Sequence, residues 1–340
     1  MRGKLLPSAV LLVAGITVAL GLAEGLVRIF APHIRDGVVP GGMFEIDSNL
    51  GWKLKPAIER RHHTRSFDVV YSINSMGFRD PPRTVARAPD KRRVLIFGDS
   101  FIFGWGVAQD QRASSFVEAA DPSTEVWNMA VPGYGLDQEI LSYELNAGSL
   151  NATDVIFYVS TFTLARTKSS FIFEKNKPRF VIDSAGQLKH VPIRESSSTR
   201  VGVVYRILSP LYLPYFLNEQ IKRLKGRDSV RARMRDESSP VRPDIVLLEK
   251  ALLLKARAIA DGRKQRMFVL ATLPEPSVKE LKDFCDRNRI ALVMVPWVVT
   301  PPNLVLGKYD GHWNPRGHRL VAAPLLTQLR AADLSGIDPR

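Results

Sequence analysis

The stretch Arg93-Val-Leu-Ile-Phe-Gly-Asp-Ser-Phe101 decides the fold that we expect for this chain. Its apolar run, Val94–Phe97, predicts a buried strand, because short runs of branched and aromatic residues that end in a turn are typical of one. The run ends in Gly98-Asp99-Ser100, which places a serine hydroxyl at the carboxyl end of the strand. Open α/β sheets bind their ligands at that edge. The stretch therefore predicts a parallel sheet and a site beside it.

Apolar runs continue to alternate with helical segments along the rest of the chain. Further strands are predicted at Glu125–Met129, Asp154–Val159, Met267–Leu270 and Ala291–Val295, and helices at Ser114–Ala120, Asp137–Asn146, Ile245–Ala260, Val278–Asn288 and Pro315–Leu329. We expect Asp137 to be the N-cap of its helix, since a short acceptor side chain there bonds the first free amides. Strands that alternate with helices build α/β folds. We therefore expect a doubly wound, flavodoxin-like parallel sheet of about five strands flanked by helices.

The organisation of the chain follows from the segments around this core. Its 340 residues are enough for one large domain with appendages. We predict a signal anchor over residues 1–32, a tether with a small β appendage over 33–90, and the core domain over 91–333. Regular periodicity is lost from about residue 161 to residue 243. We predict an irregular insertion there, serving as a lid or a membrane-facing flap.

The N-terminus predicts a membrane anchor. Arg2 and Lys4 form a short positive flank, and Leu5–Ala23 is a stretch of 19 residues without a charge. That length spans the ~30 Å hydrocarbon core of a bilayer and exceeds the ~7–15 apolar residues of a cleaved signal peptide. We expect a single-pass signal anchor, with its basic end in the cytoplasm and the rest on the extracytoplasmic, periplasmic side. A signal peptide cleaved near Ala19-Leu-Gly21 and a core helix of a soluble protein are the alternatives.

The net charge of +14 at pH 7 indicates an anionic partner or a solvated basic face. Basic residues cluster at Arg60–His63, at Lys91–Arg93 and, most densely, at Lys222–Arg235. Anionic lipid headgroups and an acidic glycan are the partners that fit such clusters. Nucleic acid is not expected, because no recognition motif accompanies the charge.

The single cysteine, Cys285, excludes a disulfide within the chain and a zinc site built from paired cysteines. Its place in Leu281–Asp286 predicts a buried position on a helix. The sequence has no constellation of metal-ligand residues and no glycine-rich phosphate loop, so we expect no cofactor. It leaves the oligomeric state open.

Three residues far apart in the sequence could together carry out acyl transfer. Ser100 is the candidate nucleophile, and a serine hydroxyl needs an imidazole to take its proton. His312 is the candidate base. Side chains two positions apart in an extended segment point to the same side, so Asp310 could orient that imidazole. The alternative is that Asp99 or Ser100 only caps the following helix.

The competing candidate for the base is His318, six residues after His312. It lies inside the final predicted helix, where a packed or solvated histidine is the ordinary case. His62 and His63 have no acidic partner nearby in the sequence, so we expect both on the surface.

Several motifs resemble those of SGNH/GDSL-type serine hydrolases, in the branch anchored to the membrane by an N-terminal helix. Gly98-Asp99-Ser100 resembles the family's first block, Asn128-Met-Ala-Val-Pro-Gly133 its second and Asp310-Gly-His312 its last. Tyr71-Ser-Ile-Asn-Ser-Met-Gly-Phe-Arg79 resembles a segment that often precedes the core in anchored members. The resemblance covers roughly residues 45–330. It implies a Ser-His-Asp triad, although many members have two residues between the acid and the histidine where this chain has one.

The resemblance also implies an oxyanion hole. Its first two donors would be the backbone N–H groups of Ser100 and of Gly133, where a glycine lets the backbone approach closely. An ordinary Pro-Gly turn is the alternative for Gly133. The family's third block normally supplies an asparagine after the third strand, and Thr161 stands at that position. A threonine hydroxyl donates one hydrogen bond and has a shorter reach, so the chain could be slower, differently specific or inactive.

Two functions from different classes follow. The first is a membrane-anchored serine esterase or O-acyltransferase that acts outside the cytoplasm on an ester-linked acyl group, such as acetyl, of a glycan or lipid. The second is a non-catalytic protein that binds an anionic polysaccharide on the same scaffold, motivated by the missing asparagine.

Overall fold

The computed structural model describes residues 5–35, 38–173, 175–193, 211–224, 243–295, 303–307 and 310–334. The chain divides into two compact units. One comprises Met1–Val39 and Glu195–Asp236, and the other comprises Pro40–Arg194 and Glu237–Arg340. The larger, second unit contains the predicted core together with the hairpins that precede it. The predicted boundaries at residues 32, 90 and 333 remain predictions.

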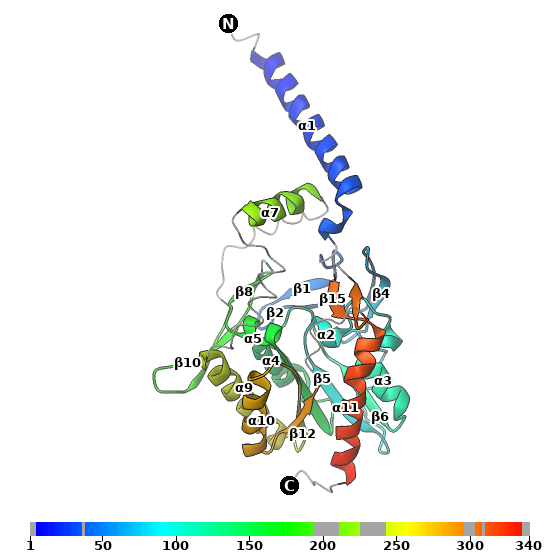
Figure 1. The fold of residues 1–340 in the computed structure, drawn as a ribbon, viewed down its shortest axis with the longest axis vertical. Coiled ribbons are helices and arrows are strands. Elements are labelled where there is room, and N and C mark those ends of the chain that lie inside the picture. The colour runs from blue at the N-terminus through cyan, green and yellow to red at the C-terminus, as the bar shows by residue number, and fades with distance from the viewer. Residues whose placement is uncertain are drawn as a thin grey trace. The chain divides into compact units, whose positions relative to one another are not determined.

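A five-stranded parallel sheet forms the centre of the larger unit (Figure 1). Its strands are β5 (Arg92–Phe97), β6 (Thr124–Asn128), β7 (Asp154–Ser160), β12 (Arg266–Thr272) and β13 (Ala291–Met294), in the order β13-β12-β7-β5-β6. All neighbours pair in parallel. The chain leaves β5 toward β6 and then returns to β7 on the other side, so the order reverses between β5 and β7. Ligands bind at such a switch point in open α/β sheets.

Helices cover both faces of this sheet, as a doubly wound fold requires. They are α2 (Ser100–Phe103), α3 (Ala113–Ala120), α4 (Leu136–Asn146), α5 (Thr161–Thr167), α9 (Pro243–Gly262), α10 (Ser277–Arg287) and α11 (Pro315–Leu334). Leu95 and Phe97 join one apolar cluster with residues of α4, α9 and α10. Because side chains alternate along a strand, Val94 and Ile96 face the opposite layer, where α3 packs with α11 (Figure 1). The predicted flavodoxin-like α/β fold is confirmed.

One predicted helix start is wrong. The helix α4 begins at Leu136, and Gly135 rather than Asp137 is its N-cap. The carboxylate of Asp137 is buried and accepts a hydrogen bond from Lys177 Nζ at 2.5 Å. Burial has the largest influence and raises the pKa of Asp137 to about 6, although the charge and hydrogen bond of Lys177 act to lower it. The side chain therefore belongs to a buried ion pair, which local sequence does not reveal.

In the described part of the chain, five short antiparallel hairpins accompany the sheet. Before the core lie β1 (Phe44–Asp47) with β2 (Gly51–Leu54) and β3 (Ile58–His63) with β4 (Asp68–Ile73), as predicted for the β appendage. The others are β8 (Phe171–Ile172) with β9 (Lys175–Asn176), β10 (Arg179–Ile182) with β11 (Leu188–Val191), and β14 (Val305–Gly307) with β15 (Asp310–Trp313).

The prediction of an irregular insertion over residues 161–243 is wrong for the described part of that range. The helix α5, two hairpins and the helix α7 (Leu213–Leu224) occur there. Strands of two to four residues are too short to give a periodic signal, which explains why the sequence looked irregular. Residues 194–210 and 225–242 lie outside the described part of the chain.

The smaller unit contains α1 (Leu5–Phe30), the short helix η1 (Pro32–Arg35) and α7. Among the described residues, α1 is the one helix whose length and composition would allow it to cross a membrane. Its side chains from Val10 to Leu22 are almost all exposed. A signal sequence near an N-terminus has the same properties, so the anchor, its topology and the side of the membrane remain predictions.

Candidate active site

The turn that follows β5 positions Ser100. A Cβ atom at Gly98 would lie 2.5 Å from Cγ1 of Ile102, so only glycine fits where the chain turns from strand to helix. Asp99 is the N-cap of α2, and its side chain accepts a hydrogen bond from the Phe101 amide at 2.9 Å. Ser100 is the first residue of α2 and is largely buried. The sequence offered two roles for Gly98-Asp99-Ser100, a helix cap and a nucleophilic hydroxyl. In the structure Asp99 is the cap, and the next residue, Ser100, carries the hydroxyl.

The strand β15 brings His312 and Asp310 to this hydroxyl. His312 Nε2 lies 2.8 Å from Ser100 Oγ, and His312 Nδ1 lies 2.7 Å from Asp310 Oδ1. The His312 amide also donates to Asp310 Oδ1 at 2.9 Å, which fixes the carboxylate against its own strand. A proton on Nδ1 would bond the carboxylate and leave Nε2 as the acceptor for the serine proton. The three predicted residues thus meet, in the relative order that proton transfer needs.

Trp105 supplies a further hydrogen bond to the carboxylate. Its Nε1–H donates to Asp310 Oδ2 at 3.0 Å, so both carboxylate oxygens have donors. Burial opposes ionisation of Asp310, but the hydrogen bonds and charge of His312 and the bond from Trp105 outweigh it, and the pKa of Asp310 is lowered. Asp310 is therefore a stable anion beside the imidazole.

Aromatic rings enclose the imidazole of His312. The Trp105 ring stacks on it at 5.4 Å between centroids, and the Phe101 ring lies 4.8 Å away on a tilted plane. Trp313 packs edge-on against Phe101 at 4.9 Å. These rings restrict the orientation of His312 and reduce its contact with water, which strengthens the polar bonds inside the site.

The loop after β6 lies beside the turn that carries Ser100. The Val131 amide donates to the Gly98 carbonyl at 3.0 Å and so ties this loop to the start of α2. Gly133 has φ +88°, and a Cβ atom there would lie 2.9 Å from Cε2 of Phe173. Trp52 Nε1 donates to the Pro132 carbonyl at 3.2 Å, so the β1–β2 hairpin holds the loop from the other side. A glycine is required at position 133, whichever role its N–H plays.

Thr161 is the first residue of α5 and directly follows β7, the strand next to β5. Phe97 pairs with Phe157 across these strands, so the turns that carry Ser100 and Thr161 leave the same edge of the sheet. The rings of Phe101 and Phe162 stack at 5.7 Å, which confirms that the two turns are neighbours. The Thr161 hydroxyl is buried, and among the described residues it has no hydrogen-bond partner. A buried donor without a partner in the fold is uncommon and costs roughly 1–3 kcal/mol.

The segment Tyr71–Arg79 clamps the loop that carries Trp105. The Tyr71 hydroxyl accepts a hydrogen bond from the Gly106 amide at 2.9 Å. The buried Arg79 guanidinium donates to the carbonyls of Gly104 at 2.5 Å and Val107 at 2.6 Å. Burial, together with the nearby charge of Arg112, lowers the pKa of Arg79 to about 9, which leaves it cationic at neutral pH. The β appendage therefore holds the residue that bonds Asp310.

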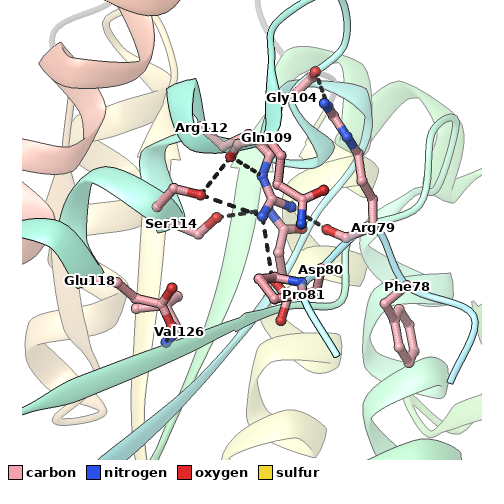
Figure 2. Close-up of polar contacts among 12 residues, drawn as sticks. Phe78, Arg79, Asp80, Pro81, Gly104, Gln109, Arg112, Ser114, Glu118 and Val126 are labelled. Carbon is pink, nitrogen blue, oxygen red and sulfur yellow. Dashed lines mark hydrogen bonds and ion pairs between the residues drawn. The ribbon is translucent and has the colours of Figure 1, made fainter. Parts of the chain in front are cut away.

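A second buried arginine completes this clamp. Figure 2 shows the Arg112 guanidinium between the carbonyls of Gln109 and Arg79 and the carboxylate of Asp80. The bond to Gln109 measures 2.9 Å and that to Asp80 measures 3.3 Å. In the same view the Arg79 guanidinium reaches Gly104 (Figure 2). Carbonyl acceptors on both arginines, together with the Asp80 carboxylate on Arg112, offset the cost of burying two cations close together.

Asp99 has a partner that the sequence did not indicate. Arg166 Nη1 lies 2.7 Å from Asp99 Oδ2 and 3.3 Å from the Tyr134 carbonyl. Arg166 is on α5, so this one side chain connects the turns that follow β5, β6 and β7. It is a positioning contact for Ser100, because Asp99 is the N-cap of the helix on which Ser100 lies.

The predictions for the other histidines are partly wrong. His62 is buried, not on the surface, because its ring packs edge-on against Trp105 at 4.7 Å and Phe67 at 4.8 Å. His63 is exposed, but its Nδ1 lies 3.3 Å from Asp68, an acidic partner supplied by the neighbouring strand β4. His318 is fully buried on α11 as a packed residue, and its Nδ1 accepts a hydrogen bond from the Ala113 amide at 3.3 Å. Cys285 is buried on α10, as expected.

Sequence reasoning missed Trp105, Arg166 and the clamping role of Tyr71 and Arg79. A tryptophan between two glycines, Gly104-Trp105-Gly106, was a signal for the first, because both glycines have positive φ values that few other residues adopt. Arg166 gave no local signal. Its role depends on three turns that meet only in the folded chain.

No protein-family model and no curated protein matches the sequence. Solved structures that resemble the fold include a member of the lipolytic protein G-D-S-L family from Veillonella parvula, with 14% identity, 69% of this chain and 97% of that chain covered, and a TM-score of 0.37. The psychrotrophic esterase EstA from Pseudoalteromonas sp. has 8% identity, coverage of 71% and 98%, and a TM-score of 0.40. A two-domain esterase active on acetylated mannans has 10% identity, coverage of 72% and 50%, and a TM-score of 0.38. Likenesses this distant do not bear on the function of this chain, which we infer from its own residues.

Proposed function

We propose that the chain is a serine esterase or O-acyltransferase of the SGNH/GDSL type, with Ser100, His312 and Asp310 as its triad. The observation that carries the proposal is the linear arrangement in which His312 lies 2.8 Å from the Ser100 hydroxyl and 2.7 Å from the Asp310 carboxylate. A buried serine, an imidazole and an anion in this order form the constellation that activates a serine nucleophile.

In the first half of the reaction, Ser100 Oγ attacks the carbonyl carbon of an ester while its proton moves to His312 Nε2. Asp310 holds the Nδ1–H tautomer and stabilises the imidazolium that forms. The imidazolium then protonates the departing alcohol oxygen, which leaves an acyl group on Ser100. The lowered pKa of Asp310 supports this role, since the group must stay ionised beside a cation.

The tetrahedral intermediate needs donors for its oxyanion. The Ser100 amide, the Gly133 amide and the Thr161 hydroxyl are the three candidates. The buried Thr161 hydroxyl lacks a partner among the described residues, which suits a donor that bonds only the reacting group. In this proposal Thr161 takes the functional position that an asparagine has in SGNH/GDSL-type hydrolases. Its side chain is shorter than that of asparagine, so its donor has a shorter reach.

In the second half, His312 takes a proton from the acceptor that attacks the acyl-enzyme, and it returns that proton to Ser100 Oγ as the bond between Oγ and the acyl carbon breaks. Water as acceptor gives hydrolysis, and a sugar hydroxyl gives acyl transfer. An ester-bearing glycan or lipid is the substrate class that we propose, because the net charge of +14 at pH 7 favours an anionic polymer or headgroup. We further propose that α1 anchors the chain in a membrane with the larger unit on the extracytoplasmic side.

The test is turnover of p-nitrophenyl acetate by the full chain in detergent, compared with Ser100→Ala and His312→Ala. We expect each substitution to lower kcat by about 10⁴-fold or more. Ser142→Ala is the matched control, because Ser142 is a buried serine on α4 outside the site, and its turnover should equal that of the unmodified chain. A serine-directed fluorophosphonate should label the control and not Ser100→Ala.

Equal labelling of all variants would contradict the catalytic role of Ser100. Equal low turnover, together with glycan binding that survives Ser100→Ala and His312→Ala but falls with added salt, would instead favour the non-catalytic binding protein.

A further inference from the structure

The helix α7 is joined to the end of the apolar stretch of α1. Glu24 is the first charged residue after Leu5–Ala23, and its carboxylate accepts hydrogen bonds from the amides of Tyr212 and Leu213. The two bonds measure 2.8 Å each, and a third contact to the Tyr212 amide measures 3.0 Å. A carboxylate at a helix N-terminus bonds free amides and is favoured by the helix dipole.

A second contact strengthens this junction. Arg28 Nε donates to Glu24 at 2.7 Å, and its guanidinium lies over the Tyr212 ring at 5.2 Å from the centroid. The start of α7 is therefore fixed at the level of α1 where apolar residues give way to charged ones. Within this unit α7 lies across α1 and not along it (Figure 1).

The position of this junction has a consequence if α1 spans a bilayer. The 26 residues of α1 are about 39 Å long, which exceeds the ~30 Å hydrocarbon core. The charge-free stretch fills the core, so Glu24 and Arg28 come at the headgroup level. A helix that starts at Glu24 and runs across α1 then lies along the membrane surface.

The sequence of α7 suits such a position. Leu213, Leu217 and Ile221 follow one another at four-residue intervals and so share one face of the helix. Leu217 is 50% exposed and Ile221 is 49% exposed. Asn218 lies roughly 100° further round the helix, and it is exposed too.

Seven of the 14 residues from Lys222 to Arg235 are Lys or Arg. An apolar helix face, with basic residues next to it in the sequence, is typical of segments that bind an anionic lipid surface.

We propose that α7 is an interfacial helix that inserts Leu217 and Ile221 into the lipid surface next to the anchor α1. The proposal rests on the membrane anchoring put forward above, but not on catalysis. It gives the chain a second membrane contact, which would hold the smaller unit at the bilayer surface in addition to the single span.

The test places an environment-sensitive NBD probe on the full chain at Leu217→Cys, Ile221→Cys or, as the matched control, Asn218→Cys. The native cysteine is buried, so the unmodified chain measures background labelling. Each labelled chain is reconstituted into vesicles of equal parts phosphatidylcholine and phosphatidylglycerol. Flotation of the vesicles then shows separately whether the chain is anchored. Circular dichroism checks that each variant keeps its helices.

We expect probes at positions 217 and 221 to emit at shorter wavelength than the probe at 218, to lose most of their quenching by aqueous iodide, and to be quenched by spin-labelled lipid. Equal iodide quenching at all three positions in floating vesicles would overturn the proposal and leave the anchor intact. Protection from iodide without quenching by spin-labelled lipid would show that a protein surface covers this face, and would also overturn it. A chain that does not float would remove both the anchor and the interfacial helix, whatever its esterase activity.

Discussion

The two sides of Ser100 are built differently. On the base side, which comprises His312, Asp310 and Trp105, the imidazole and both carboxylate oxygens have hydrogen-bond partners. On the proposed oxyanion side, which comprises Gly133 and Thr161, the Thr161 hydroxyl is buried, and no partner for it occurs in the described part of the chain. The comparison teaches that the fold by itself completes the base side, whereas the oxyanion side keeps an unused donor. Unsatisfied buried donors are uncommon in folded proteins.

The largest effect that distinguishes the two sides should come from Asp310→Asn. An amide cannot stabilise the imidazolium and can favour the wrong tautomer, so we expect kcat to fall by about 10⁴-fold. Turnover of p-nitrophenyl acetate measures the effect. Asp68→Asn is the control, because Asp68 is also paired with a histidine, His63, but on the exposed hairpin β3–β4. Comparable losses in both variants would mean that the effect of Asp310 is not specific to the site.

On the oxyanion side, Thr161→Val removes the hydroxyl and keeps the shape of the side chain. We expect kcat to fall by about 10²–10³-fold, the usual cost of losing one oxyanion donor. The free energy of unfolding should stay the same or rise, because the lost hydroxyl has no partner in the described fold. Thr161→Ser, which keeps a donor, should retain most of the activity. Unchanged kcat in Thr161→Val would show that the hydroxyl takes no part in turnover.

A further comparison separates His312, on the base side, from the packed His318 of α11. Burial, with smaller contributions from Arg79 and Arg112, lowers the pKa of His318 from 6.5 to about 3, so the folded chain holds it neutral. The unfolded chain binds that proton below about pH 6.5, so the contribution of His318 to stability is complete above pH 6.5 and falls until about pH 3.

At about pH 4.5 the expected loss from this one group is roughly 3 kcal/mol relative to neutral pH. In His318→Asn, the new side chain can still accept the hydrogen bond from the Ala113 amide. We expect the free energy of unfolding of this variant to fall less than that of the unmodified chain between the two pH values, and the difference should equal the loss given above. Denaturant titrations at both pH values give the free energies of unfolding. Parallel losses in the two chains would contradict a neutral, buried His318.

The smallest effect should come from Trp105→Phe. The ring is kept, but the 3.0 Å hydrogen bond to Asp310 is lost, and a hydrogen bond to a charged group contributes roughly 1.5–3 kcal/mol. We expect kcat to fall by at least about tenfold, which is roughly 1.4 kcal/mol. Because the bond also helps to keep Asp310 ionised, the acidic limb of the rate profile should move toward higher pH.

Trp127→Phe is the matched control for that variant. Trp127 is buried, and its Nε1–H has no hydrogen-bond partner among the described residues. Its replacement should leave turnover nearly unchanged. A similar fall in both variants would indicate that loss of an indole ring, and not of the bond to Asp310, is responsible.

The strands and most helices could be predicted because their signal is local. Residues 94–97 and 155–159 are continuous apolar runs, as strands buried on both faces require, and the structure places them in β5 and β7. The irregular insertion, in the described part of residues 161–243, and the N-cap at Asp137 were wrong. Hairpins of two to four residues leave no periodicity, and the Asp137–Lys177 pair joins residues 40 positions apart.

The sequence by itself determined the α/β sheet, the apolar length of α1 and the residue types able to activate Ser100, because periodicity and side-chain chemistry are local properties. The sequence also predicted that Ser100, His312 and Asp310 meet, and their distances agree with that prediction. Their catalytic role remains a prediction. Only the tertiary structure decided that Trp105 bonds Asp310, that Arg166 joins three turns through Asp99, and that Tyr71 and Arg79 clamp the intervening loop. Each contact connects elements distant in the chain, and its energy depends on burial that exists only after folding.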